Sequence, residues 1–303
     1  MINLSTSAFY ERGTRQISVL RGRAESLQNQ IGTGDRLERS SDDPVAAARL
    51  RSLARSERLS EVDTRNSGMA QADLSLTDQT LGSISELVVR VRELAVQASS
   101  STIKDDQRAA LGAEIAGLRA HLLQLSNTRN VAGHALLGGQ SAGAAYADTP
   151  PGASYQGTAS AVPLEIGDGQ QVVPGLTGPE IFEFNGGAGT TDLFTVLADL
   201  ATSLQSGNPA AGTFAQDSLE LLDAGLEKIT TAQTVVGGRL NWIDLVSERR
   251  ADSSERVAAE RAEVGGADIA VTMSRFQETL TVLEASQASF VRLSNLSLFS
   301  ILR

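Results

Sequence analysis

The chain has 303 residues, of which 41% are hydrophobic and none is cysteine, and its formal net charge is −10. The acidic charge argues against a nucleic acid as the main partner, and the lack of cysteine excludes disulfides, thiolate catalysis and cysteine-ligated metals. The charge is uneven along the chain: residues 1–135 sum to +1, residues 136–228 to −10 and residues 229–303 to −1.

The N-terminal part predicts long helices. The first helix carries apolar residues in alternating steps of three and four, which place them on one stripe: Ile17, Leu20, Ala24, Leu27 and Ile31. The next helix is expected to begin at Asp43-Pro44, with Asp43 as the N-cap and Pro44 at the first helical position. A cation site at Asp42-Asp43 is the alternative, but no further oxygen ligand recurs at a suitable spacing. The same apolar spacing predicts helices over residues 74–95 and 111–125.

The middle of the chain differs in composition. Six of the seven prolines lie between residues 150 and 209. Because proline breaks a helix and glycine weakens it, we expect no helix over residues 138–190. Short β-type runs at 161–166, 171–173 and 180–184 predict a small β-rich insert that projects from one end of the helices. Asp192 is expected to cap the helix that follows.

The C-terminal part again predicts helices, with apolar spacing from Leu222 to Ile243 and a heptad seam near the end of the chain. The seam consists of Ile269, Met273, Phe276, Leu280, Leu283 and Phe290, with Gln287 as its polar member. A single amphipathic helix of this length is marginal in water, so each terminal helix needs a partner. That partner is either the other terminus, another subunit, or further helices of one bundle.

No catalytic, cofactor-binding or metal-binding residues are predicted. The two histidines, His121 and His134, belong to neither a Glu-x-x-His nor a His-Glu-x-x-His arrangement, and the glycine pairs lack the lysine of a phosphate loop. No stretch of about 18 apolar residues is present, so we expect no membrane span. The N-terminal residues lack the pattern of a cleaved secretory signal. The sequence favours a structural protein over an enzyme.

Several motifs resemble the bacterial flagellin superfamily. The turn Gly32-Thr33-Gly34 followed by Ser40-Ser41-Asp42-Asp43-Pro44-Val45-Ala46-Ala47-Ala48 is similar to the N-terminal region of that superfamily, although Asp35 stands where a basic residue is usual. Gly238-Arg239-Leu240-Asn241 and Asp268-Ile269-Ala270 resemble its second helical half. The Asp-Pro-Val-Ala-Ala-Ala form and the Ser297-Leu298-Phe299 ending look more like hook–filament junction proteins than like filament flagellin.

The resemblance implies a mainly α, elongated, multi-domain fold with a small outward β domain. Residues 1–43 and 265–303 would pair as an inner coiled coil. Residues 44–137 and 191–264 would form the two halves of a helical bundle, and residues 138–190 the outward-facing insert. The terminal apolar residues, together with Leu298 and Phe299, would then form the assembly interface between subunits.

The implied function is a structural adaptor of the bacterial flagellum. A ring of these subunits would join the first hook–filament junction protein to the flagellin filament, without a cofactor. The resemblance further implies export through the flagellar type III apparatus with a dedicated chaperone, and hence an extracellular location. Filament flagellin itself is the alternative. An enzymatic insert is a third possibility, but residues 135–190 contain no histidine, cysteine or lysine.

Overall fold

A computed structural model describes the backbone of residues 3–150, 152–187 and 189–301, and the side chains of residue 8 and of 10–293 with the same two gaps. Six long or medium helices are α1 (Asn3–Thr33), α2 (Pro44–Ser99), α3 (Asp105–Ser126), α5 (Leu193–Gln205), α6 (Ala211–Gly265) and α7 (Ile269–Ile301). The prediction of a mainly α fold with a β-rich insert is confirmed. The chain divides into two compact units, residues 1–58 with 252–303 (the terminal unit) and residues 59–251 (the bundle unit).

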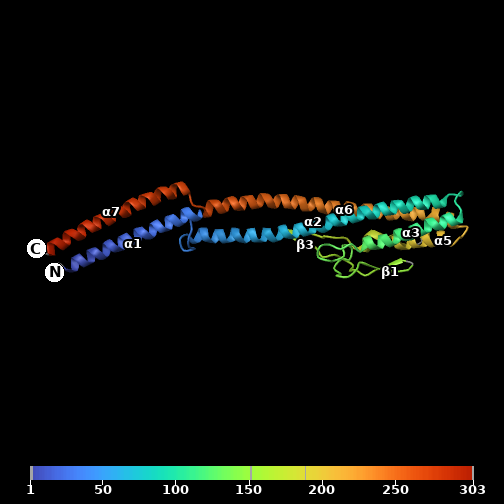
Figure 1. Cartoon of the computed structure of the whole chain (residues 1–303), viewed down its shortest axis with the longest axis horizontal. Coiled ribbons are helices and arrows are strands. Elements are labelled where there is room, and N and C mark those ends of the chain that lie inside the picture. The colour runs from blue at the N-terminus through green and yellow to red at the C-terminus, as the bar shows by residue number, and fades with distance from the viewer. Residues whose placement is uncertain (1–2, 151, 188, 302–303) are drawn as a thin grey trace. The chain divides into compact units, whose positions relative to one another are not determined.

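In the terminal unit, the two ends of the chain pair with each other. Helices α1 and α7 pack side by side in opposite directions, and both chain ends lie at the same end of the pair (Figure 1). The first turns of α2 and the last turns of α6 complete this unit, with Ala46, Ala47 and Leu53 buried between them.

In the bundle unit, the apolar stripes predicted from spacing form the core. Leu74, Leu81, Ile84, Val88 and Val91 of α2 are all buried, as are Leu222, Ile229, Val236 and Ile243 of α6. Helices α3 and α5 pack closely on each other, and Gly112 of α3 allows the approach because a Cβ there would lie 2.9 Å from the carbonyl oxygen of Ala201 in α5. Asp192 caps α5 by accepting a hydrogen bond from the N–H of Thr195 at 3.0 Å, as predicted.

The described residues of the insert form three two-stranded antiparallel sheets. Strands β1 (Tyr146–Thr149) and β2 (Gly152–Tyr155) form the first, β3 (Leu164–Gly167) and β4 (Gln170–Val172) the second, and β5 (Glu183–Asn185) and β6 (Thr190–Asp192) the third. The expectation of no helix over residues 138–190 is wrong at α4 (Gly178–Phe182). Residues 180–182, predicted as strand, are helical because Glu180 accepts hydrogen bonds from both the backbone N–H and the hydroxyl of Thr177.

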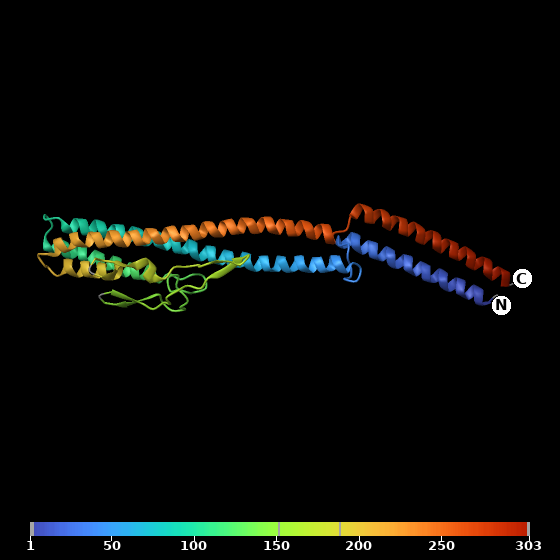
Figure 2. The ribbon, with the colours of Figure 1, turned by 180° about the vertical axis from the view of Figure 1, so that it is seen from behind.

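The β3–β4 hairpin folds back onto the helices, which corrects the expectation that the insert projects from one end. Asn66 of α2 donates to the carbonyl of Glu165 at 2.9 Å, and Arg250 of α6 donates to the carbonyl of Ile166. Arg239 donates to the carbonyl of Gly175 at 2.7 Å, just beyond β4. The yellow-green hairpin therefore runs along α2 and α6 (Figure 2). Ile166 is buried by this docking.

An aromatic cluster joins the insert to the bundle. Tyr146, Phe182 and Phe194 lie with ring centroids 4.9–5.6 Å apart, and Tyr155 lies 5.2 Å from Tyr146. Burial raises the pKa of the Tyr146 phenol, so this ring stays neutral across the working range of pH. Because aromatic residues are only 4% of the chain, this cluster concentrates four of its eleven tyrosine and phenylalanine residues in one place of the bundle unit.

Candidate assembly interface

The apolar stripe of α1 faces α7. Ala24 and Leu27 are buried, and Ile17, Leu20 and Ile31 are half-buried. These five residues follow the predicted spacing along the whole helix. The stripe has little apolar surface, because it consists of four large aliphatic side chains and one alanine. The stability of the α1–α7 pair therefore depends on how closely this stripe fits α7.

The stripe of α7 differs from the predicted one. Phe276, Leu280, Leu283, Gln287 and Phe290 are half-buried, but Ile269 and Met273 remain 44% and 40% exposed. These two side chains are therefore only partly covered within one chain, and their place in the interface between subunits stays a prediction. Thr272 and Thr279, which directly precede Met273 and Leu280 in the sequence, are buried instead. A threonine methyl group satisfies such a position, and each hydroxyl can bond the preceding turn, as that of Thr279 does to the carbonyl of Arg275 at 2.7 Å.

Large apolar side chains are exposed on both flanks of this seam. Ile269, Met273 and Val291 lie on one flank of α7 by helical spacing, and Val271, Val282 and Leu293 lie on the other. The backbones of Leu298 and Phe299 belong to α7, but their side chains lie outside the described residues. In the free chain, α7 thus presents more apolar surface than α1 covers.

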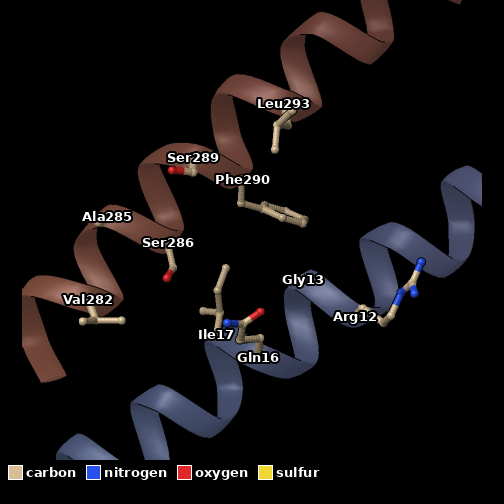
Figure 3. Close-up of a pocket in the computed structure, with 10 residues that line it drawn as sticks. All are labelled: Arg12, Gly13, Gln16, Ile17, Val282, Ala285, Ser286, Ser289, Phe290 and Leu293. Carbon is tan, nitrogen blue, oxygen red and sulfur yellow. The ribbon is translucent and has the colours of Figure 1, made fainter.

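Phe290 fills the space above a glycine of α1. A Cβ built on Gly13 would lie 2.8 Å from the Phe290 ring, and Tyr10 meets the same ring edge-to-face with centroids 5.6 Å apart. In Figure 3 the ring points from α7 across the gap to Gly13, and Ile17 points toward α7 beside it. The helices enclose here a groove of about 660 Å³ that also includes Val282 and Leu293.

A short bridge joins the two helix breaks of the terminal unit, after α1 and after α6. Asp35 and Gly266 form an isolated antiparallel pair, with the N–H of Arg36 donating to the carbonyl of Gly265 at 2.7 Å. The N–H of Ala267 donates to the carbonyl of Gly34 at 2.8 Å, and Gly34 has a φ of +77°, which favours glycine. The break after α1 and the break after α6 are therefore held together by backbone hydrogen bonds.

Arg36 links this bridge to the start of α2. Its guanidinium donates to the carbonyl of Val264 at 3.0 Å and to the Asp43 carboxylate at 3.3 Å. Asp43 also accepts from the N–H of Ala46 at 3.0 Å, and Pro44 is the first residue of α2. The hydrogen bond from Ala46, followed by the contact with Arg36, lowers the pKa of the Asp43 carboxyl.

Ion pairs cross between α2 and α6 in the same unit. Arg49 donates to both carboxylate oxygens of Glu260, from Nε and from Nη2, with the longer contact at 2.8 Å. Arg261 pairs with Glu57 at 2.8 Å. The hydrogen bond from Arg49 lowers the pKa of the Glu260 carboxyl. The spacing of residues in the sequence did not predict these roles of Arg36, Arg49 and Glu260. Each of them contacts a residue that is far away in the sequence and becomes a neighbour only when the antiparallel helices pair.

The described residues include no group of three or more histidine or acidic side chains placed to hold a metal ion. His121 and His134 lie in α3 and in a loop of the bundle unit, away from the terminal residues in sequence. None of the described helices is long and apolar enough to cross a membrane.

The chain is similar in sequence and in fold to known proteins of the bacterial flagellum. Residues 5–142 match the bacterial flagellin N-terminal helical region. Flagellar hook-associated protein 3 of Escherichia coli is 26% identical over 99% of both chains, whereas a flagellin of Halalkalibacterium halodurans is 22% identical over 90% of this chain and 89% of its own. The solved structure of a flagellar hook-associated protein from Vibrio parahaemolyticus aligns with 74% of this chain and all of its own, with a TM-score of 0.69 and 21% identity.

The resemblance to the flagellin superfamily that the motifs predicted is confirmed. Over its full length the chain is more similar to flagellar hook-associated protein 3 than to the flagellins that it matches.

Proposed function

We propose that this chain is a structural adaptor of the bacterial flagellum, which joins the hook, through the first junction protein, to the flagellin filament. The observation that carries the proposal is the excess apolar surface of α7. Ile269, Met273 and Val291 on one flank and Val282 and Leu293 on the other are at least 40% exposed in a single chain. Surfaces of this kind are stable in water only when a further helix covers them.

Charge supports packing between copies at the chain ends. Residues 1–135 and 229–303 have net charges of +1 and −1, whereas residues 136–228 carry −10. A large like charge opposes association, so nearly neutral ends favour contacts between subunits and the acidic middle favours solvent. The terminal residues of α1 and α7 are therefore the proposed assembly interface, with α7 contributing the larger share of the apolar surface.

The adaptor and the filament subunit share a fold, so the distinction rests on other grounds. Similarity to hook-associated protein 3 of Escherichia coli extends over nearly the whole of both chains and supports the adaptor. The partners in this proposal are further copies of the chain in a ring, the first junction protein and flagellin. Export through the flagellar type III apparatus with a chaperone is part of the same proposal, which has no catalytic step.

The test uses a strain that lacks this chain and is complemented with variants. Deleting residues 265–303 removes α7, and we expect hooks without filaments and flagellin released into the medium. Circular dichroism of the purified variant checks that the remaining helices still fold. Normal filaments after this deletion would refute the proposal.

A second measurement separates the adaptor from filament flagellin. A gold-labelled antibody against the chain should mark the tip of the hook as a narrow band in electron micrographs. Labelling along the whole filament would instead identify the chain as a filament subunit.

A further inference from the structure

The fit between α1 and α7 depends on one unusual layer. Gly13 lies inside α1, where glycine is less favourable than alanine, so a residue without a side chain here needs a reason in the packing. The reason is Phe290, whose ring occupies the space of a Gly13 Cβ. Gly22 of the same helix is a contrast, because a Cβ there would meet nothing within 4 Å.

Counting in heptads from this layer shows what faces what. Because the helices are antiparallel, stepping seven residues forward on α1 corresponds to stepping seven back on α7. The layers that follow are Gly13 with Phe290, Leu20 with Leu283, and Leu27 with Phe276. The side chains of the second and third layers are of ordinary coiled-coil size on both helices. Only the first of these three layers combines the smallest residue with an aromatic ring.

The layers between them discriminate poorly between registers. Counting from the same origin, Thr272, Thr279 and Ser286 face the aliphatic residues of α1 in these layers. Small side chains accept several neighbours of different size, so a slip of one heptad would change little there. A slip that brings Leu283 against Gly13 would, however, replace the Phe290 ring by a smaller side chain and leave a void above the glycine.

We propose that Phe290 and Gly13 form a lock that sets the register of the α1–α7 pair near the chain ends. The Asp35–Gly266 bridge joins the chain at the opposite end of the pair. Along the helices themselves, size complementarity between Phe290 and Gly13 is the main contact that discriminates between registers. The register also decides which residues of α7 face other subunits. This consequence alone rests on the proposed function.

The absence of cysteine allows a direct test by cross-linking. Ala24 and Thr279 are both buried and face each other in the counted register, so the double variant Ala24→Cys, Thr279→Cys should form a disulfide under mild oxidation. The double variant Ala24→Cys, Thr272→Cys reports a slip of one heptad. In the counted register its two positions lie about 10 Å apart along the helix axis, at 1.5 Å per residue, which exceeds the reach of a disulfide.

The lock itself is tested by adding Gly13→Leu to each of the two double-cysteine variants. We expect the Ala24–Thr279 cross-link to be lost or replaced by the shifted one, and we expect Phe290→Ala to restore it by vacating the layer. Gly22→Leu is the matched control, since it adds the same side chain to the same helix in open space and should leave the cross-link unchanged.

Three outcomes would overturn the lock. They are an unchanged Ala24–Thr279 cross-link in the Gly13→Leu variant, failure of Phe290→Ala to restore a lost cross-link, and absence of both cross-links in the chain with wild-type Gly13. The readout uses the purified full chain and needs no filament. A failed lock therefore leaves the hook-tip labelling and the α7 deletion as independent tests of the proposed function.

Discussion

Replacing Ile269 by aspartate separates the stability of the free chain from its assembly. Ile269 is the first residue of α7 and is 44% exposed. Burying a whole isoleucine side chain contributes about 1.5–3 kcal/mol, so the part already buried in the free chain contributes about 1–1.5 kcal/mol. A carboxylate in the first turn of a helix is favoured by about 0.3–1 kcal/mol. The expected net loss in the free chain is thus about 1 kcal/mol or less.

The assembled state is affected far more. If a neighbouring subunit covers the exposed part of Ile269, the variant must bury a carboxylate without a partner, at an effective cost of several kcal/mol. At 1.4 kcal/mol for each factor of ten, a cost of about 4 kcal/mol weakens the contact roughly a thousandfold.

The assay compares urea unfolding of the purified variant with filament growth in the complemented strain. We expect a small change in the unfolding midpoint and a loss of filaments and swimming. Val131→Asp is the control, because Val131 is fully exposed in a loop of the bundle unit and should tolerate the charge. Normal filaments with Ile269→Asp would refute the reasoning that the exposed flank of α7 is covered on assembly.

Three further predictions concern the stability of each unit, all measured by denaturant unfolding. Gly112→Ala should destabilise the chain by about 1–3 kcal/mol, because the added Cβ meets a carbonyl oxygen of α5. Gly117→Ala in the same helix faces open space and should stabilise the chain by about 0.5–1 kcal/mol. Equal effects of the two variants would contradict the close packing of α3 on α5. Asn127→Ala removes two hydrogen bonds of 2.9 Å to the backbone of the buried Tyr146 and should cost about 2–4 kcal/mol, so a neutral result would refute the tether. Asp43 has a lowered pKa in the folded chain, so its contribution is present above the unfolded value of about 3.9 and is lost as the pH falls through the folded value. The difference between wild type and Asp43→Ala should therefore shrink in acid, and a pH-independent difference would exclude the carboxylate as its source.

Apolar spacing was a reliable guide where a helix has one buried face. The stripe from Leu74 to Val91 is buried throughout, because a helix in a bundle must turn its apolar side to the core. The same reasoning did not show that Ile269 and Met273 would stay exposed in a single chain, because α7 is apolar on more than one side. Spacing alone cannot tell which of several apolar rows meets a helix of the same chain.

The insert was less predictable in detail than the helices. Strands β1 and β6 are only four and three residues long, and their pairing depends on distant contacts such as that of Asn127 with Tyr146. Residues 180–182 have β-type composition, but the Thr177–Glu180 capping interactions make them helical. Short elements of this kind are determined by their surroundings more than by their own propensity.

The pairing of the chain's two ends also has a consequence for the order of folding. Gly13 and Phe290 are separated by almost the entire sequence, so closing that loop in an unfolded chain is entropically costly. Once the bundle unit has folded and Asp35 has paired with Gly266, the remaining loop is short. We expect the terminal pair to close last, progressing from that bridge outward to the ends. Amide hydrogen exchange during refolding should accordingly protect α2 and α6 before α1 and α7.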